Sequence, residues 1–166
     1  VLKGYSFLAD AWSAGGNLGT IRDGLTGALA STQTAGLVFG GETAPGPKSA
    51  DTEEYNGSTW SEQNNLATAR KVCGGAGTQT SGLAFGGFTS PGLTVLSSTE
   101  EYGGTSWTSG GALGTARYNV AGAGTQTAGL AIGGTPPSVS GLTNVEEYGG
   151  TSWTAGGSLP ISRRAN

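Results

Sequence analysis

The sequence contains no histidine and no methionine, and only one of its 166 residues is a cysteine. Histidine is the commonest general base and metal ligand near neutral pH, so its absence removes the usual centre of many active sites. We therefore expect no catalytic residue, no metal and no cofactor. The single cysteine, Cys73, cannot form an intrachain disulfide. Without a methionine the chain does not begin at its own start codon, and we expect a processed product or a segment of a longer polypeptide.

Charge is sparse as well. Charged residues make up 11% of the chain, the net charge is −3, and the largest basic cluster is the pair Arg163–Arg164. A surface that follows a phosphate backbone needs clustered lysine and arginine, so we expect no nucleic-acid partner. No stretch approaches the 18 apolar residues of a membrane span, and we expect no membrane partner. With 33 glycines and 6 prolines, the composition favours a β protein rich in turns.

What the sequence does have is a repeat of about 47 residues. Tryptophan occurs at positions 12, 60, 107 and 153, and an arginine follows each of them ten residues later. "EEY" and a Gly-Gly pair recur in the same phase, and a string such as "GTQTAGLAIGG" at 124–134 occurs three times. Four markers in one phase are not a coincidence. The markers of the full units are Arg22, Arg70, Arg117, Glu54, Glu101, Glu147, Tyr55, Tyr102, Tyr148, Trp60, Trp107 and Trp153.

Each unit is predicted to form four short strands. The run of small residues after the arginine, the apolar run before the Gly-Gly pair, the segment ending in "EEY" and the tryptophan segment are all separated by turn residues. The "NG" or "GG" after "EEY" predicts a tight primed hairpin turn, in which both central residues have positive φ. Four antiparallel strands on this period are typical of a β-propeller blade, so we predict an all-β fold of about three such blades.

The order of these markers resembles the kelch repeat. An apolar run into Gly-Gly, then a tyrosine, a nearby tryptophan and an arginine before the next unit all match that pattern, from Trp12 to Arg163. The resemblance implies that the repeated tyrosines and tryptophans pack between blades. The wording of the repeats is also similar to kelch-like repeats in predicted proteins of marine bacteriophages.

The phase of the markers divides the chain into units. Residues 1–21 are predicted to be a partial blade, 22–61, 70–108 and 117–154 three full blades, and 155–166 the start of a further blade or a tail. Known propellers have four to eight blades, and an incomplete ring leaves open edges. We expect either a homodimer that closes a six-bladed ring or further blades in a longer parent chain.

The repeated acidic pairs are the first candidates for chemistry. Adjacent residues of a strand point to opposite faces, so the two carboxylates of a pair do not converge as paired catalytic acids do. We expect one glutamate of each pair to form a structural ion pair with the repeated arginine, without knowing which one. "CGGAG" at 73–77 lacks the lysine and the helix of a phosphate loop, and is expected to be an inner strand with Cys73 in the core.

The loops that follow the Gly-Gly pairs differ between units, and loops on a rigid scaffold often carry binding functions. The exposed candidates for binding are expected to be Lys48, Phe88, Pro91 and Leu93, and Pro136 and Pro137 are further candidate binding residues. The sequence favours a non-enzymatic structural or protein-interaction module, and the second resemblance implies a place in a phage virion or tail. The alternatives are a carbohydrate-binding lectin with a glycan ligand on the loop face and, less favoured, a fragment of a larger propeller enzyme.

Overall fold

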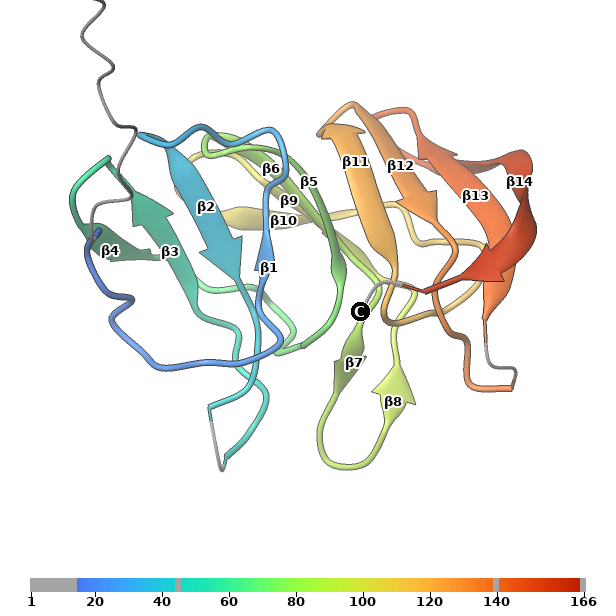
Figure 1. The fold of residues 1–166 in the computed structure, drawn as a ribbon, viewed down its shortest axis with the longest axis horizontal. Helices are drawn as coiled ribbons and strands as arrows, with labels where there is room; N and C mark the ends of the chain where they lie inside the picture. Colours follow the sequence, from blue (N-terminus) through green and yellow to red (C-terminus); the bar gives the residue numbers. More distant parts are fainter. Residues whose placement is uncertain (1–14, 44–45, 139–140, 165–166) are drawn as a thin grey trace, which may run out of the picture.

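The computed structural model describes residues 15–43, 46–138 and 141–164 (Figure 1). These residues contain fourteen strands and no helix. The fold is all-β, as the sequence predicts, and consists of three four-stranded antiparallel sheets and one small hairpin. The predicted partial unit at residues 1–21 lies largely outside the described residues, the first of which is Gly15.

Each full repeat unit forms one sheet. The first sheet has the order β1 (Thr26–Gly27), β2 (Gly36–Phe39), β3 (Thr52–Tyr55) and β4 (Trp60–Gln63). The second contains β5 (Gly74–Thr78), β6 (Ser81–Phe85), β9 (Thr99–Tyr102) and β10 (Trp107–Gly110). The third contains β11 (Ala121–Thr125), β12 (Ala128–Ile132), β13 (Leu142–Tyr148) and β14 (Trp153–Arg163). The hairpin is formed by β7 (Phe88–Thr89) and β8 (Thr94–Val95).

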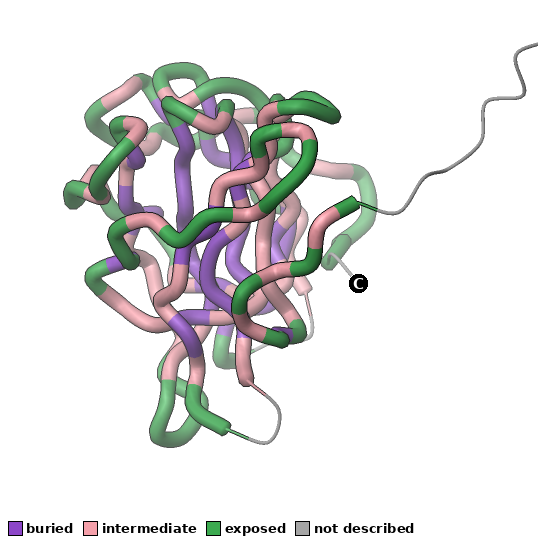
Figure 2. The backbone as a smooth tube through the Cα atoms, turned by 90° about the vertical axis from the view of Figure 1, so that its left-hand side faces the viewer, coloured by how far each residue is buried: buried purple, intermediate pink, exposed green. Residues whose placement is uncertain are grey.

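The sheets pack against one another in chain order, with β5 in contact with both β1 and β11. One buried apolar cluster joins the first and second sheets, and a second cluster of nearly the same composition joins the second and third. Figure 2 shows the buried backbone running through the middle of the molecule, with exposed residues at the turns. The matching leucines of the two clusters, Leu37 and Leu83, are 1% and 0% exposed.

The innermost strands are rich in glycine because the neighbouring sheet approaches their backbone. A Cβ atom on Gly75 would collide with the carbonyl oxygen of Gly27 in the first sheet. A Cβ atom on Gly122 would collide in the same way with the carbonyl oxygen of Gly75. The "GGAG" string is therefore part of an inner strand, as predicted, and its glycines are required by close packing.

The Gly-Gly pairs are required by the next unit along the chain. Both glycines of the first pair, Gly40 and Gly41, have positive φ. A Cβ atom on Gly40 would lie 2.5 Å from the carbonyl oxygen of Arg70, and that same oxygen accepts a hydrogen bond from the Gly41 amide (2.9 Å). Two recurring markers of the sequence, the glycine pair and the next arginine, are thus in direct contact.

The turns after "EEY" differ from the prediction. Four residues separate Tyr55 from its strand partner Trp60, and the Asn56 amide donates to the Thr59 carbonyl (3.1 Å). Gly57 has positive φ, whereas Asn56 does not. The Asn56 side chain instead accepts hydrogen bonds from the amides of Ser58 and Thr59, which stabilises a wider loop than the predicted two-residue primed turn.

Candidate functional site

The repeated arginines lie at the centre of buried hydrogen-bond networks. Arg70 is fully buried, and its guanidinium donates to the carbonyls of Gly86 (3.0 Å) and Ser98 (2.9 Å) and to the carboxylate of Glu100 (2.7 Å). The second carboxylate oxygen of Glu100 accepts the backbone amide of Ala67 (2.7 Å). Buried charges are tolerated when they are paired and hydrogen-bonded in this way.

The other two units repeat this network. Arg22 pairs with Glu53 at 2.6 Å, and Arg117 pairs with Glu146. The first glutamate of each "EEY" therefore faces the arginine of its own unit, which settles the alternative that the sequence leaves open. The pKa of Arg117 is lowered, because the effect of burial is larger than the opposing effect of its partner Glu146. In all three units the first glutamate is bound to a buried arginine. These carboxylates therefore hold the connection between units and are not free for acid–base chemistry.

The second glutamate of the first two pairs faces the following sheet. The hydroxyl of Tyr102 donates to Glu54 (2.9 Å), and the hydroxyl of Tyr148 donates to Glu101. Burial, and then the bond to Glu101, raise the pKa of Tyr148 to about 12. Strand alternation thus directs the two carboxylates of each pair to opposite sides of the sheet, as the sequence predicts.

The tryptophans complete the contact with the preceding sheet. Trp107 packs edge-on against Phe39, with ring centroids 5.0 Å apart, and its indole N–H donates to the hydroxyl of Thr52 (2.9 Å). Trp153 repeats both contacts with Phe85 (4.9 Å) and Thr99 (2.9 Å). The resemblance-based expectation that tyrosine and tryptophan pack between units is confirmed at both junctions.

A glutamine in the repeated string also crosses each junction. The side-chain amide of Gln79 donates to the carbonyls of Gly36 (3.3 Å) and Tyr55 (2.8 Å). Gln126 donates in the same way to Gly82 (3.0 Å) and Tyr102 (2.7 Å). The sequence pattern predicts only a turn for this string, and the role of the glutamine is missed. The signal for this role is that a glutamine recurs at the same position of all three strings, at Gln33, Gln79 and Gln126.

We call the side chains that meet where two sheets pack the junction set. It consists of the tyrosine, tryptophan and glutamine of one sheet, and of the second glutamate and the leucine of the sheet before it. Each end of the stack carries one half of this set. The first sheet presents the donors Tyr55, Trp60 and Gln33. The third sheet presents Glu147, and Ala128–Leu130, Glu147 and Tyr148 line a hollow there.

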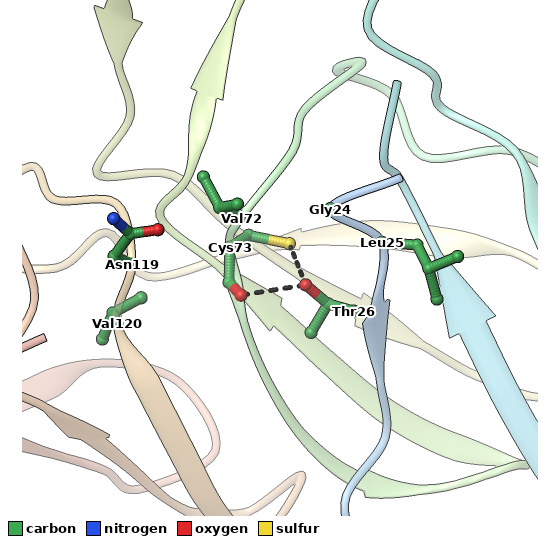
Figure 3. A pocket seen from close by; sticks show the side chains of 7 residues that line it. All are labelled: Gly24, Leu25, Thr26, Val72, Cys73, Asn119 and Val120. Carbon is green, nitrogen blue, oxygen red and sulfur yellow. Dashed lines mark hydrogen bonds between the residues drawn. The ribbon is translucent and has the colours of Figure 1, made fainter. Parts of the chain in front are cut away.

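A second hollow, of about 150 Å³, lies where the three units meet (Figure 3). Thr26 donates to the Cys73 carbonyl (2.9 Å), and the Cys73 thiol donates to the Thr26 hydroxyl (3.3 Å). Burial raises the pKa of the Cys73 thiol, which disfavours the nucleophilic thiolate. Cys73 belongs to the core, as predicted. The hollow is lined by Gly24, Leu25, Thr26, Val72, Cys73, Asn119 and Val120.

The backbone at this hollow links the units in series. The Val72 amide donates to the Gly24 carbonyl (2.9 Å), and the Asn119 amide donates to the Val72 carbonyl (2.9 Å). All three residues have positive φ and occupy the same position in their units. The hollow is thus bordered by a chain of equivalent hydrogen bonds that passes from one unit to the next.

The predicted loop residues do not form one exposed surface. Lys48 is bound to Glu42 (2.6 Å), and Phe88 packs edge-on against Tyr118 with Lys48 5.3 Å from its ring centroid. Bonds from Lys48 and then Lys71 lower the pKa of Glu42, and the bond to Glu42 raises the pKa of Lys71.

The expectation that Lys48 and Phe88 are freely exposed is therefore wrong, because loops of three units pack together there. Pro91 and Leu93 are exposed, as expected; of the two further candidates, Pro136 is buried and Pro137 is exposed. The three variable loops nevertheless lie at the same end of the molecule (Figure 1).

Membrane-spanning helices and metal-binding clusters are both absent from the described part of the chain. None of its segments forms a helix long and apolar enough to cross a membrane. Within residues 15–43, 46–138 and 141–164, no group of three or more cysteine, aspartate or glutamate side chains is arranged to hold a metal ion.

Comparison with known proteins supports the fold alone. No protein-family model matches the chain, and no curated protein sequence matches it. The solved structure of YjhT is similar, with a TM-score of 0.70 at 15% sequence identity over 87% of this chain. The match covers 48% of the YjhT chain, so this chain spans about half of that length.

Proposed function

We propose that the chain is a non-enzymatic structural and protein-interaction module built as a kelch-like β-propeller segment, with each four-stranded sheet as one blade. Three features support this architecture. The sheets pack in chain order, each unit repeats the same markers, and the inner strands are rich in glycine where they approach one another. The similarity to YjhT concerns the fold and extends over 87% of this chain.

The observation that carries the proposal is the use of the repeated polar residues. At both internal junctions, the tyrosine, tryptophan and glutamine of one sheet bind the sheet before it. The repeated arginines and first glutamates bind within their own units. The residues that recur are therefore assembly residues, and the chain is suited to joining further blades of the same kind. In this proposal two copies complete a six-bladed ring.

The variable loops supply the surface that distinguishes this module from another of the same architecture. They lie together at one end of the stack, and the exposed residues Pro91, Leu93 and Pro137 differ between units. A rigid scaffold that presents variable loops is suited to binding a protein partner. A place in a virion or tail is the setting that the sequence resemblance implies.

The molar mass in solution tests the proposed self-association. Size-exclusion chromatography with light scattering should give about twice the chain mass of 16.3 kDa at micromolar concentrations. Small-angle scattering should give the compact profile of a closed ring. A strict monomer across the whole concentration range would overturn ring closure by homodimerisation.

A further inference from the structure

We propose that the open face of the third sheet binds the open face of the first sheet of a second copy, through the same residue contacts that join the internal sheets. This inference rests on the proposed function, since it assumes that the module self-associates. The proposed interface is head-to-tail, and two copies form a closed ring through two identical junctions.

The polar half of the junction set predicts the first contacts. Glu147 occupies the position of Glu54 and Glu101, which accept tyrosine hydroxyls from the following sheet. Its partner in the second copy is Tyr55, which occupies the position of Tyr102. The carbonyls of Gly129 and Tyr148 correspond to those that Gln126 binds in the second sheet, and they would accept the amide of Gln33.

The apolar half is complementary in shape. At the second junction, Leu83 lies so close to Gly129 that a Cβ atom there would approach the leucine to within 2.9 Å. Leu37 and Gly82 have the same relation at the first junction, at 2.6 Å. Leu130 is the next leucine of this series, and it is only half-buried because no sheet covers it within the described residues. Gly36, on the other open face, is the glycine that would receive it.

Gly27 points to the same conclusion. Its counterparts Gly75 and Gly122 cannot carry a Cβ atom, because each meets a backbone atom of the preceding sheet. A Cβ atom on Gly27 would meet only the Leu37 carbonyl, at 3.5 Å, so none of the described residues of this copy requires a glycine there. In the proposed interface, Gly27 faces the carbonyl of Gly122 from the second copy, which does require it.

Two substitutions make the proposed junction weaker than the internal ones. Ile132 stands where Phe39 and Phe85 meet a tryptophan, and Val145 stands where Thr52 and Thr99 accept an indole N–H. Trp60 of the second copy would therefore pack against aliphatic side chains without an indole hydrogen bond. An interface that keeps the tyrosine and glutamine contacts but loses this bond should dissociate more readily than the internal sheets separate.

Formation of this junction requires one segment to move. Residues 156–163 follow Trp153 at the same spacing at which residues 15–22 follow Trp12, so both would occupy the connection to the first sheet. In the first sheet, Arg22 binds Gly40, Asp51 and Glu53, and the Gly19 amide binds Glu53. The competing Arg163 is exposed, and its carbonyl accepts the Gly134 amide (2.8 Å). Residues 156–163 belong to β14 and pair with β13 at Ser158 and Arg163, so association must break this pairing. The C-terminal segment is the one that is displaced, because the Arg163 side chain is exposed whereas Arg22 is buried in its hydrogen-bond network.

The test uses variants that disable one open face at a time. Leu130→Asp places a charge on the face of the third sheet, and Gln33→Glu with Tyr55→Phe removes two donors from the first. Each should raise the dimer dissociation constant at least about tenfold, as expected for the loss of one or more hydrogen bonds or a buried leucine. Leu93→Asp is the matched control, because it makes the same change at an exposed site on the hairpin loop.

Mixing the two disabled variants is the decisive measurement. Each mixed dimer has one junction made of two intact faces, so the equimolar mixture should associate more tightly than either variant alone. A mixture no tighter than its components, or equal effects of Leu130→Asp and Leu93→Asp, would overturn this interface while leaving self-association in place. A monomeric wild type would instead reject the self-association of the proposed function. Thermal melts of each variant establish that it is folded.

Proteolysis tests the displaced segment. Trypsin should cleave after Arg163 and Arg164 faster in the wild-type dimer than in the Leu130→Asp monomer, because association frees residues 156–163. Slower cleavage in the dimer would show that this segment stays in place, and that the N-terminal residues of the second copy move instead.

Discussion

The second and third sheets are built from nearly the same sequence but have different surroundings. The second is covered on both faces, and its Leu83 and Phe85 are fully buried. Among the described residues, the third is covered only on the side of the second sheet, and the equivalent Leu130 and Ile132 are half-buried. The same position of the repeat thus occurs in a covered and in an open sheet. Comparing the two separates the stability that a residue provides within its own sheet from the stability that it provides by packing against the next sheet.

The comparison also shows that a junction buries apolar side chains that a sheet with one open face leaves half-exposed. An isolated small sheet with one exposed apolar face is only marginally stable, and stacking repeat units is the usual remedy. The two clusters that span the junctions contain the largest buried apolar side chains of the described residues. Substitutions that disturb a junction should therefore cost more than the same substitutions on an open face.

The largest difference should come from the arginines. Arg70→Met leaves Glu100 buried without its partner, and the loss of one member of a buried pair costs about 3–5 kcal/mol of the free energy of unfolding. Arg163→Met, at the equivalent but exposed position, should change it by less than about 0.5 kcal/mol. Urea unfolding followed by tryptophan fluorescence measures both.

A double variant sharpens this result. Arg70→Met with Glu100→Leu removes both charges and should regain much of the lost stability, because the penalty comes mainly from the unpaired carboxylate. Equal losses for Arg70→Met and Arg163→Met would contradict the assignment of the arginine to a buried structural network.

The glycines of the inner strands should show a smaller difference. Gly75→Ala forces a Cβ atom against the Gly27 carbonyl, and overpacking of this kind costs about 1–3 kcal/mol. Gly27→Ala has room in the single chain and should be neutral or stabilising by up to about 1 kcal/mol. Unfolding midpoints in urea, measured at concentrations where the chain is monomeric, distinguish the two.

The same pair of variants also tests the proposed interface. Gly27→Ala should weaken self-association although it leaves the monomer stable, because the Gly122 carbonyl of the second copy would meet the new methyl group. A Gly27→Ala variant that associates as tightly as the wild type would mean that nothing approaches this position.

The sequence predicts the parts of this fold that depend on the chain's own period. Phased glycines, tyrosines and tryptophans identify the units, and alternation along a strand sends the two glutamates of each pair to opposite sides. It does not show that the first glutamate binds the arginine, because both members of a pair are identical in type and the choice depends on the side from which the connection approaches. The role of Gln79 was missed for a related reason, since its partners are backbone carbonyls of another unit and carry no side-chain signature.

The loop cluster could not be predicted at all. Lys48, Phe88 and Tyr118 come from three different units and share no repeated wording. Their contact depends on the lengths and paths of loops that have no common pattern. Exposure inferred from a residue's place in a variable loop is therefore wrong for Lys48 and Phe88, and right for Pro91 and Leu93.

The smallest effect should be a pH dependence carried by a junction tyrosine. Burial against the second sheet and the bond to Glu101 raise the pKa of Tyr148 to about 12, whereas the unfolded chain has a tyrosine pKa of about 10. Below about pH 10 the hydroxyl is protonated in both states, and its contribution to stability is fully present. Between about pH 10 and 12 only the unfolded chain loses this proton, so stability falls as pH rises through that window.

Tyr148→Phe isolates this contribution. At about pH 8 the variant should lose about 1 kcal/mol, because Glu101 loses the hydroxyl that it binds, and the urea midpoint of the variant should then fall less steeply than that of the wild type from about pH 10 to 11.5. Subtracting the two curves removes the titration of the lysines and of the other tyrosines, which both proteins share. Parallel curves would mean that the Tyr148 hydroxyl is as free to ionise in the folded protein as in the unfolded chain. The second junction would then lack the counterpart of the bond between Tyr102 and Glu54, and the same bond could not be expected between Tyr55 and Glu147 of two copies.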